Sequence, residues 1–532
     1  MNKIIFASII GVFAVSNTQA QNVKTFNANW SSEKIYLQPD ASSYTEDVTY
    51  YNELGSPTQH IGIQASPTGY NILQPIYYDE MLRDSVRSYL PVVTESTTGQ
   101  MFADHLLLSR YQQTYGTTEN GYVYDETTYD NCITNRRIAN TNVGSIFREH
   151  QKTASYKYEV NNDDDILKIE MISNDEFAVN GTWQNGLLRK VSFRNEDGGR
   201  TIRFTDMQQN VILERMTDGT EYLDTYYVYD PLNRLCWVIP PECSNGLMTG
   251  SYSLDSQNVA RYCYRYDYDS RGRIVSKKIP GCDAVSYVYD RNDRPAMTQD
   301  GNMRKSNGWT YVQYDPHGRP ETTYYLELAN KTQAQLQALF DAGQTDELQN
   351  DTSKQLLSRC YYDGIADDGT YSPSSEAVFR PVEGILENSD VNRNRKGYKT
   401  REELAVINPD KGYKSTIRRT FYYDHRGRLI QTVETNCLGY ESCTTVKYDF
   451  CGNILKIHES HKVTSSQQPD ILLREYTYDT RGRKLSETTT LNDGAPVVVT
   501  YAYDNLGRLA STTTGTGANA RTTTYAYNIQ GW

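Results

Sequence analysis

The stretch "REYTYDTRGRKLSETTT" at residues 474–490 decides the fold, because the chain soon repeats its central skeleton. The second copy reads "VTYAYDNLGRLASTTT" and occupies residues 499–514. Both contain Tyr-x-Tyr-Asp-x-x-Gly-Arg and then run into a threonine-rich tail. A supersecondary unit that is written twice at short range indicates a repeat architecture.

The residue types in the first copy favour a β-hairpin. Strand alternation places Tyr476 and Tyr478 on one face. Asp479 can accept a backbone N–H and start a turn, and Gly482 suits the positive φ of a type I turn with a bulge. Arg483 opens the return strand, where its guanidinium can reach the aspartate or stack on a tyrosine ring. No single hairpin is stable alone, so we expect neighbouring hairpins to bury each other's tyrosines.

The same skeleton recurs along the chain. Further copies are "YVYDPLNRL" (227–235), "YDYDSRGRI" (266–274), "YVYDRNDRP" (287–295), "VQYDPHGRP" (312–320), "YYDHRGRLI" (422–430), "VKYDFCGNI" (446–454) and "YAYNIQGW" (525–532), with looser copies at 49–57, 76–84 and 204–212. The predicted turn residues are Asp230, Asp269, Gly272, Arg273, Asp290, Asp315, Gly318, Arg319, Asp424, Gly427, Arg428, Asp449, Gly452, Asp479, Gly482, Arg483, Asp504, Gly507 and Arg508. Most aspartates are 21 to 30 residues apart. That spacing fits two strands and two turns and is too short for a βαβ unit, so the predicted class is mainly β with antiparallel hairpins.

The repeats and the segments between them predict six regions. These are a signal peptide (1–20), an N-terminal region with degenerate repeats (21–150), an antiparallel β region (151–225), repeats (226–320), an insert with short helices and loops (321–420), and repeats of which the last is truncated (421–532). In the insert, "KTQAQLQALF" has helical spacing, "TSKQLLSR" (352–359) suggests a second short helix, and residues 364–384 read as a loop.

The N-terminus and the composition limit where the protein can be located and what it can bind. "MNKIIFASIIGVFAVSNTQA" has a positive start, a short apolar run and a small-residue exit, which predicts a secretory signal and an exported protein. The run is shorter than the roughly 20 residues that span a bilayer. Hydrophobic residues make up only 38% of the chain, so we expect the 45 tyrosines to fill much of the buried space. A net charge of −12 argues against a nucleic-acid partner.

The nine cysteines leave two interpretations open. Cys236 with Cys243, and Cys437 with Cys443, are close enough in sequence to bridge in an oxidising compartment. The count is odd and no Cys-x-x-Cys pair occurs, so free packed thiols are an equal alternative.

Three candidate sites in the sequence also have a purely structural explanation. Asp/Arg pairs such as Asp424 with Arg428 could be catalytic, but a reactive group is normally singular and these recur at each turn. "HESH" at 458–461 would place its histidines on opposite faces of a strand, with no third ligand nearby. "NNDDD" at 161–165 lacks the glycine and the glutamate of a calcium loop. We therefore name no catalytic residue, no metal site and no cofactor, and expect no enzyme.

The recurring skeleton resembles the YD repeat of the Rhs family, which includes shell proteins of insecticidal toxin complexes and the animal teneurins. The resemblance covers about residues 206–532 apart from the insert. The signal peptide, the early "VTYYNELGSP" and the helical insert look like secreted Rhs-type proteins of Bacteroidetes-like bacteria. The resemblance implies a β-sheet strip that curves or spirals into a hollow shell. It also implies a C-terminal toxin that the shell encloses and that an aspartate-based self-cleavage releases.

The sequence departs from this family plan at its end. It stops at Trp532 inside a repeat, without a core segment, a cleavage region or a toxin. We therefore expect a truncated frame or the N-terminal part of a longer protein, whose last half-hairpin leaves an unpaired strand edge. Toxin delivery does not carry over to these residues.

Three functions remain as hypotheses. The leading one is an exported structural β-shell of a toxin-encapsulating or cell-surface system, with a C-terminal toxin or core segment as its missing partner. The alternative is a surface adhesion module whose exposed tyrosines bind glycans or a neighbouring cell surface. A glycosidase with paired carboxylates is the weakest, since no acidic pair stands out from the repeats.

Overall fold

The computed structural model describes residues 24–25, 27–83, 86–119, 121–130, 132–163, 165–253, 256–329, 331–363, 379–408, 412–462 and 468–532. The signal peptide predicted at 1–20 lies outside these residues. Across the described part, none of the helices combines the length and the apolar character that a membrane crossing needs.

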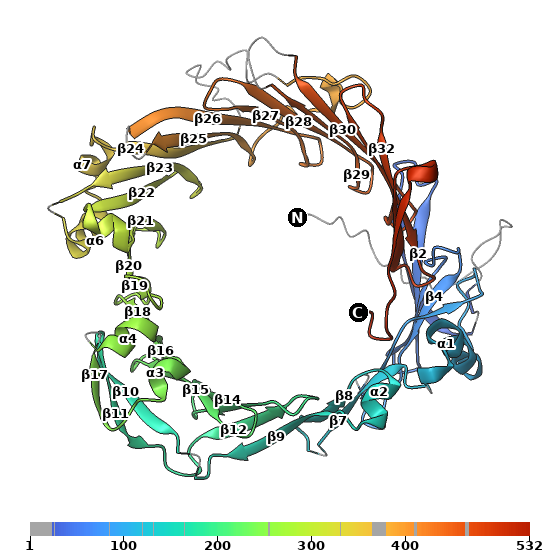
Figure 1. The fold of residues 1–532 in the computed structure, drawn as a ribbon, viewed down its shortest axis with the longest axis horizontal. Coiled ribbons are helices and arrows are strands. Elements are labelled where there is room, and N and C mark those ends of the chain that lie inside the picture. The colour runs from blue at the N-terminus through green and yellow to red at the C-terminus, as the bar shows by residue number, and fades with distance from the viewer. Residues whose placement is uncertain are drawn as a thin grey trace.

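One long antiparallel sheet forms most of the molecule, and it curves around an open centre (Figure 1). Each strand is hydrogen-bonded to the next in an unbroken series from β5 to β34. The prediction of a mainly β fold, with antiparallel hairpins joined into a curved sheet, is confirmed. The strands of this sheet are β5 (Arg87–Tyr89), β7 (Tyr124–Tyr129), β8 (Arg137–Thr141), β9 (Ala154–Val160), β12 (Arg189–Arg194), β13 (Arg200–Thr205), β14 (Val211–Thr217), β15 (Tyr222–Tyr229), β16 (Leu235–Ile239), β18 (Tyr264–Tyr268), β19 (Ile274–Lys278), β20 (Val285–Tyr289), β21 (Pro295–Gln299), β22 (Gly308–Tyr314), β23 (Pro320–Glu327), β24 (Gln355–Tyr362), β25 (Lys399–Asn408), β26 (Gly412–Tyr423), β27 (Leu429–Thr435), β28 (Glu441–Tyr448), β29 (Ile454–His461), β30 (Asp470–Tyr478), β31 (Lys484–Leu491), β32 (Val497–Tyr503), β33 (Leu509–Thr514) and β34 (Arg521–Thr524).

The two ends of this sheet do not pair with each other within the described residues. β34 pairs with β33, and β5 pairs with β7 and, through one bridge, with Ile76. All four residues of β34 are exposed. The ring is therefore not completed by main-chain hydrogen bonds between its first and last strands.

A separate five-stranded sheet lies where the two ends of the ring approach each other, with β2 and β4 beside the last strands (Figure 1). Its order is β1–β2–β3–β4–β6. The strands are β1 (Asn29–Tyr36), β2 (Tyr44–Tyr51), β3 (Pro57–Gly62), β4 (Asn71–Pro75) and β6 (Val92–Thr94). Helix α1 (Leu107–Tyr115) packs on it through Leu107 and Tyr111, which join a buried cluster with Val48, Tyr50 and Leu73.

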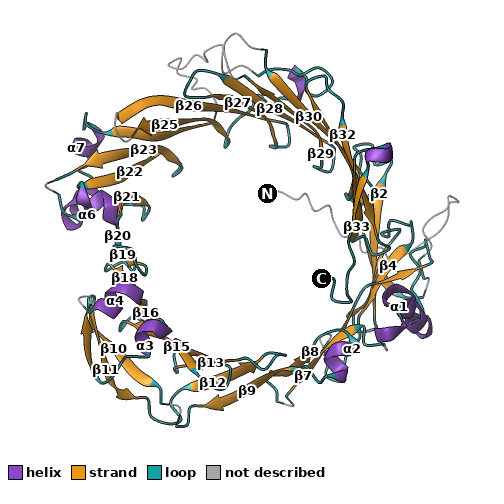
Figure 2. Ribbon diagram, in the orientation of Figure 1, coloured by secondary structure: helices purple, strands orange, loops and turns teal. Residues whose placement is uncertain are grey.

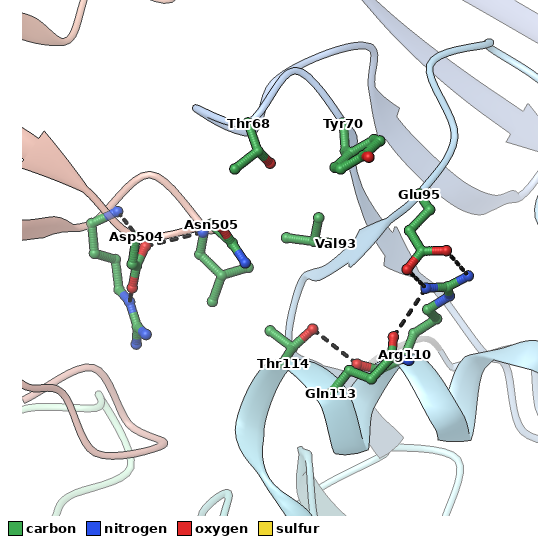
Figure 3. Close-up of a pocket in the computed structure, with 11 residues that line it drawn as sticks. Thr68, Tyr70, Val93, Glu95, Arg110, Gln113, Thr114, Asp504 and Asn505 are labelled. Atoms are coloured by element: carbon green, nitrogen blue, oxygen red, sulfur yellow. Dashed lines mark hydrogen bonds and ion pairs between the residues drawn. The ribbon is translucent and has the colours of Figure 1, made fainter.

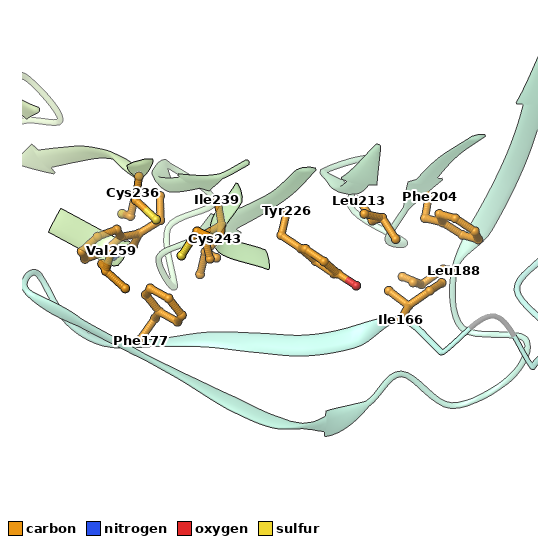
Figure 4. Close-up of a cluster of buried hydrophobic side chains, with 13 residues drawn as sticks. Ile166, Phe177, Leu188, Phe204, Leu213, Tyr226, Cys236, Ile239, Cys243 and Val259 are labelled. Atoms are coloured by element: carbon orange, nitrogen blue, oxygen red, sulfur yellow. The ribbon is translucent and has the colours of Figure 1, made fainter. Parts of the chain in front are cut away.

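A three-stranded sheet covers part of the main sheet and creates the largest buried cluster (Figure 4). It consists of β10 (Leu167–Ser173), β11 (Glu176–Thr182) and β17 (Gly250–Ser253). Phe177 from β11 meets Trp237 from β16, and both side chains are fully buried. Helices α3 (Pro241–Ser244) and α4 (Gln257–Tyr262) contribute Cys243 and Val259 to the same cluster.

The insert contains helices and strands. The helix expected from "KTQAQLQALF" is α6 (Gln333–Ala342), which begins with a capping box at Thr332 and buries Leu336 and Phe340 against the main sheet. α6 lies on the outer side of the ring (Figure 2). The remaining helices are α2 (Ser145–Glu149), α5 (Gly301–Lys305) and α7 (Asp346–Gln349), together with single 3-10 turns at Asp104–Leu106, Thr117–Glu119, Asn388–Asp390 and Gly517–Asn519.

The prediction of a second helix in "TSKQLLSR" was wrong. Most of this segment belongs to β24, which pairs with β23 on one side and β25 on the other. Five of the eight residues, Gln355 to Arg359, join this strand and gain main-chain partners in the sheet, so tertiary context overrides the local helical pattern. Of the loop expected at 364–384, residues 364–378 lie outside the described part.

Candidate functional site: the repeat turns and the ring junction

Each repeat turn is held by its aspartate in the same way. In the copy at 422–430, Asp424 Oδ1 accepts the backbone N–H groups of Arg426 and Arg428, both at 2.9 Å. Asp424 Oδ2 accepts from Nε of Arg428 at 2.6 Å. The loop closes when Gly427 N donates to Asp424 O at 3.0 Å. Equivalent sets of side-chain bonds form at Asp230, Asp269, Asp290, Asp315, Asp479 and Asp504.

The fourth position of the turn has a positive φ in each copy. The predicted glycines there are Gly272, Gly318, Gly427, Gly452, Gly482 and Gly507, with φ between +76° and +97°. Two copies that lack glycine use Asn233 and Asp293 instead, each at φ +60°. Asparagine and aspartate tolerate this left-handed region better than other side chains, which explains why these copies keep the turn.

The arginine of each turn also contacts the following hairpin. The Arg428 guanidinium lies 4.8 Å from the ring centre of Tyr448, and the Tyr448 hydroxyl donates to Leu429 O at 3.1 Å. Six other turns repeat both contacts, with the arginine over the ring and the tyrosine hydroxyl donating to the carbonyl of the residue after that arginine. The pairs are Arg234 with Tyr268, Arg273 with Tyr289, Arg294 with Tyr314, Arg319 with Tyr362, Arg483 with Tyr503 and Arg508 with Tyr527. The arginine of each of these turns thus binds the aspartate of its own turn and the tyrosine of the next hairpin, so successive hairpins are coupled along the sheet.

Several members of this network were missed by the sequence analysis. Arg234 and Arg294 make the complete set of contacts although their copies lack the glycine. Asp130 Oδ2 accepts a hydrogen bond from Nε of Arg136 at 2.6 Å, as in the repeat turns. More residues separate this aspartate from its arginine than in the octet, so the repeat pattern did not reveal the pair. The Tyr129-Asp130 sequence before an arginine is the signal that could have found it.

The repeat at 446–454 has an asparagine in place of the arginine. Asn453 stands at that position and donates to Asp449 Oδ2 at 2.8 Å. A neutral amide keeps the bond to the aspartate but cannot provide a cation over the ring of the next hairpin. We therefore expect the link between this turn and the next hairpin to be weaker than at the turns that carry arginine.

The carboxylates of several turns have lowered pKa values. Burial raises the pKa of Asp230, but hydrogen bonds from the backbone and side chain of Arg234 outweigh it and hold the pKa below its usual value. Asp269 and Asp315 are lowered for the same reasons by Arg273 and Arg319. Such groups stabilise the fold above their unfolded pKa and lose that contribution as the pH falls through the folded value.

We expect acid to destabilise the protein below about pH 4, where carboxylates with an unfolded pKa of about 3.9 begin to protonate. Denaturant midpoints at pH 7, 5, 4 and 3 test this. Asp269→Asn should lower the midpoint at pH 7 and flatten the loss between pH 4 and 3, because it removes one titrating group. An equal acid slope in the variant would contradict the assignment.

A cavity of about 320 Å³ lies at the junction of the ring (Figure 3). Thr68 and Tyr70 from the connection between β3 and β4, with Val93 of β6, line one side, and the turn that begins at Asp504 and Asn505 lines the other. Arg110 of α1 makes a bidentate pair with Glu95, at 2.8 and 3.0 Å. The Arg110 contacts hold the pKa of Glu95 below its usual range. The cavity thus offers one aromatic ring among polar groups.

The other sequence candidates do not form a reactive cluster. His458 and His461 both lie on β29, where burial lowers the pKa of His458 and His461 Nδ1 lies 2.6 Å from Ser442 Oγ. The buried Asn161 binds Gln184 O and Leu188 N, and so anchors a turn. In the described residues, no group of three or more His, Cys, Asp or Glu side chains could hold a metal.

All nine cysteines are free thiols in the structure. Cys243 is hydrogen-bonded to Cys263, and the two lie together in the largest buried cluster. Cys132, Cys282, Cys437 and Cys451 are exposed. The pairs proposed from sequence proximity are therefore not bridged.

Comparison with known proteins gives one family match and a set of structural likenesses. The model of "Domain of unknown function (DUF6443)" matches residues 23–160. No curated protein matches the chain. Similar solved structures include the TcdB2-TccC3-Cdc42 crystal structure, at TM-score 0.49 and 13% identity, covering 94% of this chain and 22% of that one. The Photorhabdus luminescens Tc holotoxin pore with the TccC3-D651A mutation has TM-score 0.46 and 13% identity, with 95% and 22% covered. The chain thus spans about a fifth of the length of these structures.

Proposed function

We propose that this protein is the curved wall of an exported container of the Rhs type. One observation carries the proposal: a single antiparallel sheet runs from β5 to β34 and bends into a ring, with each turn coupled to the next hairpin by an arginine and a tyrosine. Such a repeated coupling stiffens a wall and leaves no single repeat as a reactive centre. The wall has no catalytic role of its own in this proposal.

The occupant of the container is a C-terminal segment that continues beyond Trp532 in the complete gene product. The solved structures that resemble this chain include toxin complexes, which agrees with this proposal and does not carry it. A signal sequence at residues 1–20 would take the protein out of the cytoplasm.

Protease protection of the secreted full-length product tests the proposal. We expect a fragment from beyond Trp532 to survive digestion of the intact protein and to be degraded once the wall is unfolded by denaturant. Detection by mass spectrometry in the culture medium would test export in the same experiment. A reading frame without such a segment, or a segment digested equally fast with the wall intact, would overturn the container.

A second candidate is glycan binding at the junction, favoured by the cavity in which the Tyr70 ring lies beside carboxylate, amide and hydroxyl groups. Aromatic faces stack on sugar rings and planar polar groups bind their hydroxyls. A glycan panel probed with the intact chain and with Tyr70→Ala would reveal this activity. Equal signals from both proteins would exclude the cavity.

A further inference from the structure

We propose that the five-stranded sheet within the region matched by the domain of unknown function is a clasp that closes the ring by holding the turns of the last hairpins. The clasp is defined here as the sheet β1–β2–β3–β4–β6 with its connecting loops. This assigns a role to the strands between Asn29 and Thr94 that form this sheet, which neither the wall nor its cargo requires, and it rests on contacts between described residues alone.

The first contact is made by Arg481, in the turn between β30 and β31. Its Nη1 lies 2.8 Å from Asp47 Oδ1 of β2. Its Nη2 donates to Ile63 O at 2.7 Å and to Glu46 O at 3.2 Å. One guanidinium thus satisfies a carboxylate and two main-chain carbonyls of the clasp, which is a specific fit for the planar donor fork of arginine.

The same turn and the next one add further contacts to this surface. Arg483 Nη1 donates to Ala65 O at 2.8 Å while its Nε holds Asp479. Ser66 Oγ, in a residue that is 2% exposed, donates to Asn505 O in the next turn at 2.7 Å. In the repeat turn before that of Arg481, Cys451 Sγ donates to Tyr36 O at 3.7 Å. The clasp therefore contacts three successive turns of the array, the name used here for the series of repeat hairpins.

The end of the array adds contacts beside the clasp. Ile529 packs against the buried cluster that contains Leu107 and Tyr111. Gln530 Nε2 donates to Val143 O at 2.8 Å. These contacts, like those of Arg481, join the two ends of the sheet where no strand pairing does so within the described residues.

Arg481 differs from its equivalents elsewhere in the array. Arg271 and Arg426 occupy the same turn position, in "DSRGR" and "DHRGR". Arg271 Nη1 reaches Asp293 at 3.3 Å, and Arg426 stacks 4.1 Å from the ring centre of Phe450, both in the following turn. Of these three arginines, Arg481 is the one directed at the clasp. The array thus presents the same residue type at equivalent turns, and position in the ring decides which one the clasp binds.

Charge reversal with a distance readout tests the clasp in the full 532-residue chain. Fluorescent labels at Leu54→Cys in the clasp and Leu491→Cys in the array would report energy transfer, after the exposed cysteines are changed to serine. Arg481→Asp faces Asp47 with a like charge, so we expect the population of open molecules to rise on the order of tenfold. Small-angle scattering should show a larger maximum dimension, and the far-UV circular dichroism should keep its β signal.

Two further variants make the test specific. The swap of Asp47→Arg combined with Arg481→Asp should restore most of the energy transfer, because the ion pair is rebuilt with exchanged partners. Arg271→Asp, the matched change at an equivalent turn, should leave the ring closed. Unchanged transfer in Arg481→Asp, no restoration by the swap, or equal opening by Arg271→Asp would each overturn the clasp. The wall proposal is unaffected by these outcomes, because its own test measures protection of a cargo.

Discussion

Replacement of Trp237 by alanine is expected to lower the free energy of unfolding of its segment by about 3–5 kcal/mol, the range for large-to-small changes in a packed core. Trp237 is 0% exposed and is the largest fully buried side chain. It meets Phe177 edge-on, with ring centres 5.4 Å apart. Removal of the indole would therefore open a cavity between the main sheet and its three-stranded cover.

The matched control is Trp237→Phe. The indole Nε1 is buried and has no hydrogen-bond partner among the residues that the structure describes, so phenylalanine removes an unsatisfied donor while it keeps most of the apolar contact. We expect a cost of about 1–2 kcal/mol for this variant. Hydrogen exchange of the β16 and β11 amides is the suitable measurement, because stability in a repeat array is local. Similar exchange rates in the alanine and phenylalanine variants would show that cavity formation is not the dominant cost.

The second large effect is expected for Asp230→Ala, which should cost about 2–4 kcal/mol. The carboxylate is 8% exposed and accepts the N–H groups of Leu232 and Arg234, each at 2.9 Å, and Nε of Arg234 at 2.6 Å. The variant leaves these donors without their acceptor in a partly buried turn. The loss should appear as faster hydrogen exchange in β15 and β16, with distant hairpins unchanged.

Two comparisons isolate the turn. Asp493→Ala removes an exposed aspartate from another hairpin loop and should change stability by less than about 0.5 kcal/mol. In a double-mutant cycle, Asp230→Ala and Arg234→Ala should be non-additive, since each removes the same bond. Additive costs would mean that the two side chains act independently.

Much of the fold could be predicted from the sequence because the repeat turn is a local structure. Asp424, Gly427 and Arg428 lie within five residues, and every bond that closes their loop forms inside that span. The helix at Gln333–Ala342 was predictable for the same reason, since its cap and its apolar spacing are local.

Other features depended on partners that are distant in the sequence. Residues 352–359 have a helical pattern, but most of them belong to β24, which pairs with β23 and β25. Arg481 looked like one more turn residue, and its partner Asp47 is more than 400 positions away. No periodicity or spacing can connect two such residues.

The sequence by itself determined the repeating hairpin, its turn and the mainly β class, because these follow from backbone conformation and hydrogen bonds within a few residues. Only the tertiary structure decided how far the main sheet bends and which of its faces are buried by the three-stranded sheet and the helices. It also decided where the five-stranded sheet meets the last turns. Those features are set by packing between segments far apart along the chain, where identical arginines acquire different partners according to their place in the ring.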